Sequence, residues 1–358
     1  MARSNEIATE IAALLRARNP LLWIVTREEA RVERYLFEAA ASAAYITRFW
    51  DVAQGVTDLA GKTVRFGSTD PGETLTAIAT AAQSNRDIER CLWILRDLPP
   101  WLTGTVGITC CRQVRNLARL LPTVPLQRAA LAVITPLPDI PPELAGQATL
   151  IEWPLPDHAE IAQLLDATID TLPEELKDIA TADGTRDAAI DAAIGLTGEE
   201  AQACIAKSLV QFRRIDPAAI AREKKRIIAR ERVLEWHDPL PGGLEAVGGL
   251  DQLKAWLISR KAAYTPQARA YGLPAPRGTL IGGISGTGKS LTAKAVATAW
   301  GVPLLRIDLG ALRSKYVGES EGNLRRALRV IEAIGRCGRN RKSIGRRHAR
   351  GGGWRGVE

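Results

Sequence analysis

A glycine-rich loop from Gly283 to Ser290 constrains the fold of this chain more than any other segment. It fits the pattern G-x-x-x-x-G-K-S/T at every fixed position. The residues before it, from Arg277 to Gly283, read as a strand, and those after it, from Leu291 to Trp300, have helical character without a breaker. A strand, a glycine loop and a helix in this order are typical of an α/β sheet whose loop backbone wraps a phosphate group. A glycine-rich turn with an incidental lysine does not account for this context.

The loop predicts a site for ATP and Mg²⁺. We expect Lys289 to reach the β- and γ-phosphates and Ser290 to hold the Mg²⁺ ion. The helix that follows adds the partial positive charge of its N-terminus. The candidate nucleotide-binding residues are Gly283, Ile284, Ser285, Gly286, Thr287, Gly288, Lys289, Ser290 and Leu291.

The first half of the chain alternates helical and strand-like segments. The expected strands are Leu21 to Thr26, Ala44 to Trp50, Cys91 to Leu95, Ala130 to Thr135 and Thr149 to Trp153. The expected helices are Glu6 to Arg18, Glu28 to Ala40, Thr74 to Ala82 and Arg112 to Leu121. This alternation predicts a parallel sheet with helices on both faces.

The first strand of this half lacks a phosphate loop. It runs into Arg27, Glu28, Glu29 and Ala30, which places two acids where a phosphate would lie, and the next glycine is Gly55. Because glycines let backbone N–H groups approach an anion, we predict that this domain binds no nucleotide. The strand from Cys91 to Leu95 ends in Arg96 and Asp97, which has the outline of a magnesium-binding strand. A lone aspartate at a strand end is common, however, and assigns no metal.

Beyond Pro156 the pattern is helical, beginning at Asp157 to Ala167. Thr197 and Glu200 have the form of a capping box for a helix that ends near Arg213. Another helix starts at Asp216 and Pro217, and its charged stretch to Arg232 is expected to be a solvated linker rather than a nucleic-acid contact. We therefore predict a small helical lid.

The basic character of the chain is concentrated at its end. The net charge is +8, yet residues 335–358 carry eight bases against one acid, Glu358, a net of +7, so the remaining residues carry +1. A folded body of this charge does not indicate a nucleic-acid partner.

Composition excludes other classes. No apolar run approaches the roughly 20 residues that a membrane-spanning helix needs, and the first 19 residues have no signal-peptide core, so we expect a cytoplasmic location and no membrane partner. The five cysteines and three histidines show no metal-ligand spacing, and we expect the cysteines to be small buried hydrophobic residues.

Several motifs together resemble the first part of an AAA ATPase module. They are Val247-Gly248-Gly249-Leu250, Tyr271-Gly272-Leu273-Pro274, the glycine loop, Thr292 to Ala297, and Ser314 to Glu321. The wording from Gly272 to Gly278 and from Gly286 to Leu291 is most similar to AAA ATPases known as a hypothetical chloroplast reading frame of cyanobacteria and algal plastids. The fold class expected is α/β, of the P-loop NTPase (AAA) type, with a small helical lid.

The resemblance implies four segments. These are a degenerate AAA-like domain without a phosphate loop (1–156), a helical lid and linker helix (157–236), a truncated ATP-binding AAA domain (237–334) and a basic tail expected to be disordered (335–358). It also implies a homo-oligomer for the intact family and a protein partner. Tyr316 lies where related unfoldases carry a pore-loop aromatic residue, although an ordinary half-buried tyrosine accounts for it equally well.

The family pattern breaks after Ile334. The resemblance implies an apolar strand ending in Asp-Glu, but no acid occurs in residues 335–357. Read one base along, the codons from Gly338 to Ser343 permit Asp-Glu-Ile-Glu-Lys, so we favour a shifted reading frame over an evolved basic tail. Two functions remain open: an ATPase that in intact form remodels a protein partner, or a nucleotide-binding fragment that does not hydrolyse ATP. A nucleic-acid-binding protein with a basic arm rests on the tail alone.

Overall fold

The computed structural model describes residues 3–84, 90–124, 129–172, 177, 185–230, 234–237, 240–264, 268, 271, 280–284, 286–300, 304–307, 327–328 and 331. The chain divides into two compact units. Unit 1 comprises Met1–Val233 with Leu309–Val330, and unit 2 comprises Leu234–Asp308 with Ile331–Glu358.

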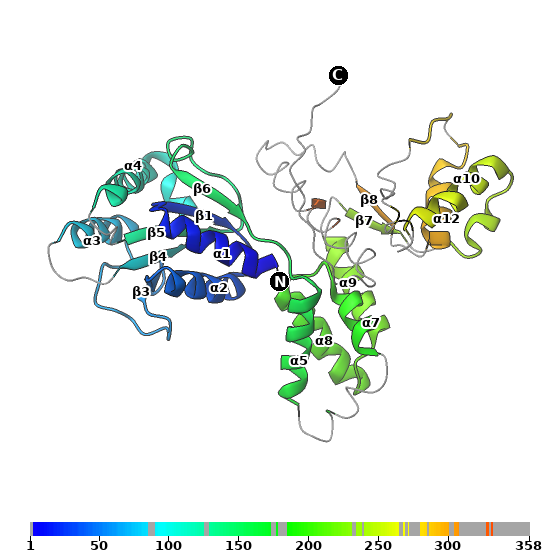
Figure 1. Ribbon diagram of the computed structural model, residues 1–358, viewed down its shortest axis with the longest axis horizontal. Coiled ribbons are helices and arrows are strands. Elements are labelled where there is room, and N and C mark those ends of the chain that lie inside the picture. Colours follow the sequence, from blue (N-terminus) through cyan, green and yellow to red (C-terminus); the bar gives the residue numbers. More distant parts are fainter. Residues whose placement is uncertain are drawn as a thin grey trace. The chain divides into compact units, whose positions relative to one another are not determined.

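Unit 1 begins with a six-stranded sheet (Figure 1). Its strands are β1 (Leu21–Val25), β2 (Ile46–Asp51), β3 (Gly55–Thr57), β4 (Cys91–Arg96), β5 (Ala129–Thr135) and β6 (Ala148–Glu152). Their order across the sheet is β3-β2-β4-β5-β1-β6, and all neighbours pair in parallel except β2 and β3. The predicted parallel sheet is thus confirmed, with an antiparallel edge strand added.

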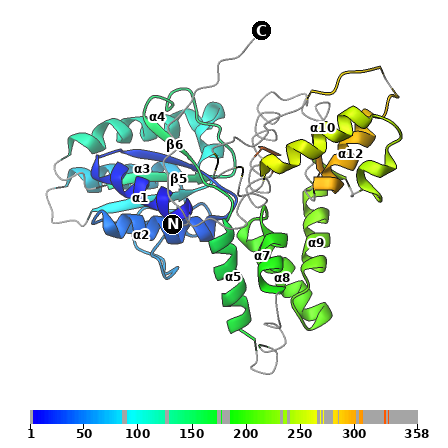
Figure 2. The same cartoon turned by 45° about the vertical axis from the view of Figure 1, so that its right-hand side comes forward.

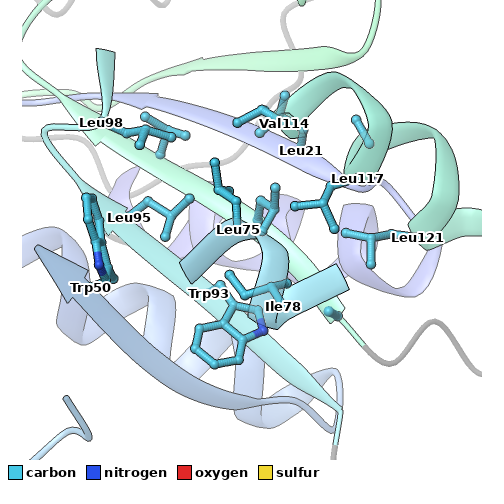
Figure 3. Packing of buried hydrophobic residues seen from close by; sticks show 14 of the residues in the cluster. Leu21, Trp50, Leu75, Ile78, Trp93, Leu95, Leu98, Val114, Leu117 and Leu121 are labelled. Atoms are coloured by element: carbon cyan, nitrogen blue, oxygen red, sulfur yellow. The ribbon is translucent and has the colours of Figure 1, made fainter. Parts of the chain in front are cut away.

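Helices cover both faces of this sheet. They are α1 (Arg3–Arg16), α2 (Glu29–Ser42), α3 (Pro71–Gln83) and α4 (Gly104–Leu120), with short 3₁₀ turns at Pro99–Leu102 and Leu121–Thr123. The side chains of β1 alternate between two cores, because successive residues of a strand point to opposite faces. Leu21 packs with α3 and α4 (Figure 3). Trp23 belongs to the same cluster, whereas Leu22 and Ile24 pack with α1 and α2.

The expected α/β elements agree with the structure in kind and in order. Each strand predicted in the first half of the chain is present with a shift of at most two residues, but α4 begins eight residues before the predicted Arg112. Strand β3 was not predicted. It has only three residues, and the turn before it depends on the Asp51 carboxylate, whose Oδ1 accepts from the N–H groups of Ala53 and Gln54.

The outer edge of β3 is covered by the chain that returns beside it. Val64 donates its N–H to the Val56 carbonyl at 2.8 Å, and Asp58 donates to the Lys62 carbonyl at 3.0 Å. Backbone groups on this edge of the sheet are therefore satisfied within the chain.

The second part of unit 1 is a set of helices that we call the helical lid (Figure 2). It consists of α5 (His158–Asp170), α7 (Thr185–Ala193), α8 (Gly198–Phe212) and α9 (Pro217–Arg230), which enclose a core of their own. The predicted capping box of α8 is confirmed, with Thr197 Oγ1 accepting from Glu200 N at 3.2 Å. A second capping box, formed by Asp157 and Glu160 at the start of α5, was not predicted.

Unit 2 contains β7 (Leu234–His237), a 3₁₀ turn at Gly243–Ala246, α10 (Asp251–Lys261), a 3₁₀ turn at Ala262–Tyr264, α12 (Lys289–Trp300) and β8 (Leu304–Ile307). Strands β7 and β8 pair antiparallel, and neither was predicted. A small core of Leu244, Val247, Leu257 and Ala295 packs α10, α12 and the first 3₁₀ turn together.

The strand expected from Arg277 to Gly283 is wrong where the structure describes it. Residues 280–283 have no regular structure, and residues 277–279 lie outside the described part. A strand needs a hydrogen-bonded neighbour, and among the described residues of unit 2 only β7 and β8 pair with each other. The helix expected from Leu291 to Trp300 is confirmed as α12.

Candidate functional site

The glycine loop of unit 2 leads directly into α12, whose first residue is Lys289. Gly286 and Gly288 have φ values of +85° and +79°, a backbone region that residues with a Cβ rarely adopt. A Cβ built at either position would meet no atom within 4 Å, so the loop lies open on the side where these glycines are bare. The loop is therefore shaped by glycine and accessible to a ligand.

Lys289 folds back over this loop. Its Nζ donates to the Gly283 carbonyl at 2.8 Å and to the Ile284 carbonyl. Thr287 Oγ1 donates to the same Ile284 carbonyl at 2.9 Å. The ammonium group thus lies against the backbone at the start of the loop.

The start of α12 supplies further donors. Thr292 closes the first turn, since its N–H donates to the Gly288 carbonyl at 2.8 Å. Ser290 and Leu291, the second and third residues of the helix, are exposed. A helix of 12 residues carries roughly half a positive charge at its N-terminus, which suits an anion. The helix N-terminus and the bare loop backbone suit an anion such as a phosphate group.

The other residues predicted for this site lie outside the described part of the chain. Ser285 and Tyr316 belong to this group, as does the whole of the basic tail from 335 to 358. Their predicted roles stay predictions, and so do the four segment boundaries.

The corresponding turn of unit 1, between β1 and α2, has a different construction. Glu28 stands at the N-cap of α2 and is buried, and its own N–H donates to Thr26 Oγ1 at 3.0 Å. Its carboxyl group accepts from Arg31 Nη2 at 2.8 Å and from the backbone N–H of Gly198 at the start of α8. Burial raises the pKa of Glu28, while Arg31 and the Gly198 N–H act in the opposite direction. A carboxyl group thus lies where a phosphate loop would bind its anion.

Arg31 links the same turn to α5. Its Nη1 donates to Glu160 Oε1 at 3.1 Å and to Ser4 Oγ at 3.1 Å, and its Nη2 also donates to the Pro154 carbonyl. Tyr35 OH donates to Glu160 Oε1 at 2.8 Å. Together with the bond from the Gly198 N–H to Glu28, these groups join the first turn of α2 to the first turns of α5 and α8.

The carboxyl end of β4 carries an arginine rather than a metal-binding acid. Arg96 Nε donates to Glu33 Oε1 at 2.6 Å, and its Nη1 donates to Asp51 Oδ2 at 3.2 Å. The hydrogen bond that Arg96 donates to Glu33 is the main cause that raises the pKa of Arg96. Asp97, the residue considered for magnesium, is exposed with φ of +47°. The guanidinium group neutralises the acids that a cation would need.

The described part of the chain offers no metal-ligand cluster, membrane-spanning helix or disulfide bond. It contains no group of three or more His, Cys, Asp or Glu side chains that could hold a metal ion. None of its helices is both long and apolar enough to cross a membrane. Of the four cysteines in this part, Cys91, Cys111 and Cys204 are buried and Cys110 is half-buried, and none of the four forms a disulfide bond.

Family profiles match three segments of the chain. The N-terminal domain of SpoVK-like AAA ATPases matches residues 7–153, and their second domain matches residues 159–231. The profile of the ATPase family associated with various cellular activities (AAA) matches residues 279–337, which include the glycine loop.

Individual relatives agree with these profiles. The uncharacterized AAA domain-containing protein ycf46 of Trieres chinensis is 35% identical over 92% of this chain and 63% of its own length. The ycf46 protein of Guillardia theta is 31% identical over 90% of this chain and 62% of its own length. A cell division cycle protein 48 homolog of Archaeoglobus fulgidus is 30% identical over 35% of this chain and 16% of its own length. The chain therefore spans less than two thirds of the ycf46 proteins that it matches.

Sequence reasoning placed the glycine loop but missed the contact between Glu28 and Gly198. The two residues are 170 positions apart, and no spacing rule joins them. The one available signal was an acid at the end of the first strand, which the sequence argument used only to exclude a phosphate.

Proposed function

Because the chain belongs to the AAA ATPase family, we propose that its loop from Gly283 to Leu291 binds ATP together with Mg²⁺. The observation that carries this proposal is the position of Lys289 Nζ, held over the loop by the carbonyl groups of Gly283 and Ile284. The backbone N–H groups of the loop and the N-terminus of α12 would hold the phosphates. Ser290 would hold Mg²⁺, which supplies charge neutralisation between the phosphates.

The rest of the family's activity is proposed for the protein at the length of its relatives. There we propose that ATP is hydrolysed, that the energy remodels a protein partner and that the protein forms a homo-oligomer. Tyr316 is proposed as the residue that contacts the partner. Support for these proposals comes from membership of the AAA ATPase family.

A titration with a fluorescent ATP analogue tests nucleotide binding. We expect one nucleotide per chain, and we expect Lys289→Ala to weaken binding by about 10- to 150-fold, as loss of a hydrogen bond to a charged group implies. Lys294→Ala is the matched control, because Lys294 lies on the same helix but outside the loop. Ser290→Ala should reduce the dependence of affinity on Mg²⁺.

Two results would contradict the proposal. One is an unchanged affinity in Lys289→Ala, and the other is an equal loss in Lys294→Ala. Phosphate release measured on the same samples tests hydrolysis at this site, since turnover there must disappear in Lys289→Ala.

A further inference from the structure

We propose that the carboxyl group of Glu28 latches the helical lid onto the α/β part of unit 1, at the turn where a phosphate loop would hold a nucleotide, so that this unit keeps its lid in place without nucleotide. The proposal goes beyond ATP binding by unit 2 and does not depend on it.

The position of Glu28 supports the latch. It ends the turn after β1 and begins α2, the strand–loop–helix position at which nucleotide-binding domains place a phosphate. Its side chain is 5% exposed, so the carboxyl group is enclosed by protein. One oxygen binds Arg31 of its own helix, and the other accepts from the Gly198 N–H of the lid.

The first turn of α8 requires hydrogen-bond partners for its backbone N–H groups. A helix leaves its first N–H groups without partners inside the helix. Thr197 Oγ1 satisfies the N–H of Glu200, while the N–H of Gly198 is satisfied by Glu28. One N–H group in the first turn of α8 is therefore satisfied by a side chain from the α/β part.

The hydrogen bond from the Gly198 N–H to Glu28 requires a close approach of the two residues. A Cβ at position 198 would lie 3.0 Å from Glu28 Oε1 and 3.3 Å from Leu164 Cδ1, both tighter than ordinary contacts. Gly198 therefore lets the carboxyl group and α5 approach the α8 backbone together.

The charges around Glu28 also support the latch. Glu28 and Glu160 both form ion pairs with Arg31. The N-termini of α2, α5 and α8 converge on these groups, and each contributes roughly half a positive charge. The same helix ends could stabilise a phosphate, and here they stabilise a residue of the chain.

Hydrogen exchange resolved at the Gly198 amide of the full chain tests the latch. Glu28→Ala removes the acceptor, and we expect exchange of this amide to become about 10- to 150-fold faster. Glu28→Gln keeps the length and an acceptor oxygen and should keep protection within about threefold. Glu28→Asp keeps the charge but is shorter by one methylene, and exchange should become faster as in the alanine variant.

Two controls separate the latch from a general loss of stability. Glu199→Ala removes an exposed glutamate from the same turn, and we expect less than about a fivefold change. The Ile24 amide, in the core strand β1, should accelerate much less than the Gly198 amide in every variant.

The Asp and Gln variants decide the question even if the Ala variant does not fold. Protection kept in Gln and lost in Asp supports a latch that depends on reach. Protection lost in Gln and kept in Asp would overturn it, because the charge next to Arg31 would then matter instead. Unchanged exchange in the Asp and Ala variants, or equal acceleration at Ile24, would overturn it too.

Discussion

Replacing Arg31 should destabilise unit 1 more than replacing any exposed arginine. The guanidinium group donates to Glu28 at 2.8 Å and to Glu160 and Ser4 at 3.1 Å each. Arg31→Met keeps an apolar stem of similar reach but removes all of these donors. Two carboxyl groups, with side chains only 5% and 3% exposed, then lose their cation.

The magnitude follows from this burial. Breaking a buried ion pair by removing one partner costs about 3–5 kcal/mol, because an uncompensated charge remains inside. For a folding unit of this size, each kcal/mol lowers the melting temperature by about 2–4 °C, so we expect a fall of about 6–20 °C. Calorimetry and urea unfolding followed by circular dichroism measure it.

The loss should depend on pH. Burial raises the pKa of Glu28, whereas Arg31 lowers it, so removal of Arg31 should raise this pKa further. A group whose pKa is raised on folding adds stability at low pH, and this stability is lost as pH rises through the folded-state pKa. Glu160 and the Gly198 N–H face the same carboxyl group from the lid. We therefore expect Arg31→Met to be closer to the parent at pH 5 than at pH 8.

Arg34→Met is the matched control, because Arg34 lies on the exposed face of α2 and contacts the Tyr35 ring at 5.1 Å. It should cost less than about 1 kcal/mol. An equal loss in both variants, or a loss below 1 kcal/mol in Arg31→Met at pH 8, would refute the reasoning.

Two further predictions concern the cores of unit 1. Ile78 is fully buried on α3 against the sheet (Figure 3). Its replacement by alanine should lower the free energy of unfolding, measured in urea, by about 2–5 kcal/mol. Ile108 is exposed, and Ile108→Ala should change this free energy little. Burial raises the pKa of Cys204 to about 11, so its reactive thiolate forms only at high pH. Iodoacetamide at pH 8 should therefore leave Cys204 unmodified in the folded chain and alkylate it in urea, as peptide masses would report; equal rates in both conditions would contradict its burial.

The α/β part of unit 1 was predictable because its central strands, β1, β4 and β5, are nearly continuous apolar runs. Strands β4 and β5 are buried on both faces, which gives Val-, Leu- and Ile-rich segments that sequence alone identifies. The capping box at Thr197 was predictable because its two partners lie three residues apart. Features whose partners lie close together in the chain can therefore be predicted from the sequence.

Features that depend on distant partners were not predictable. Strand β3 takes its place from pairing with β2, and its three residues carry no alternating pattern. The irregular backbone at residues 280–283 likewise depends on whether a neighbouring strand is present, which an apolar run does not specify. The link between Glu28 and Gly198 arises only when the lid folds back onto the first turn of α2.

The covered outer edge of β3 bears on how this sheet meets other polypeptides. Because Val56 and Asp58 already pair with Val64 and Lys62, an extended segment of another protein finds few vacant backbone groups there. Sheets with open borders recruit foreign strands and seed aggregates. Here the edge is covered by a return of its own chain, so strand exchange between neighbouring folded molecules is disfavoured at this side of the sheet.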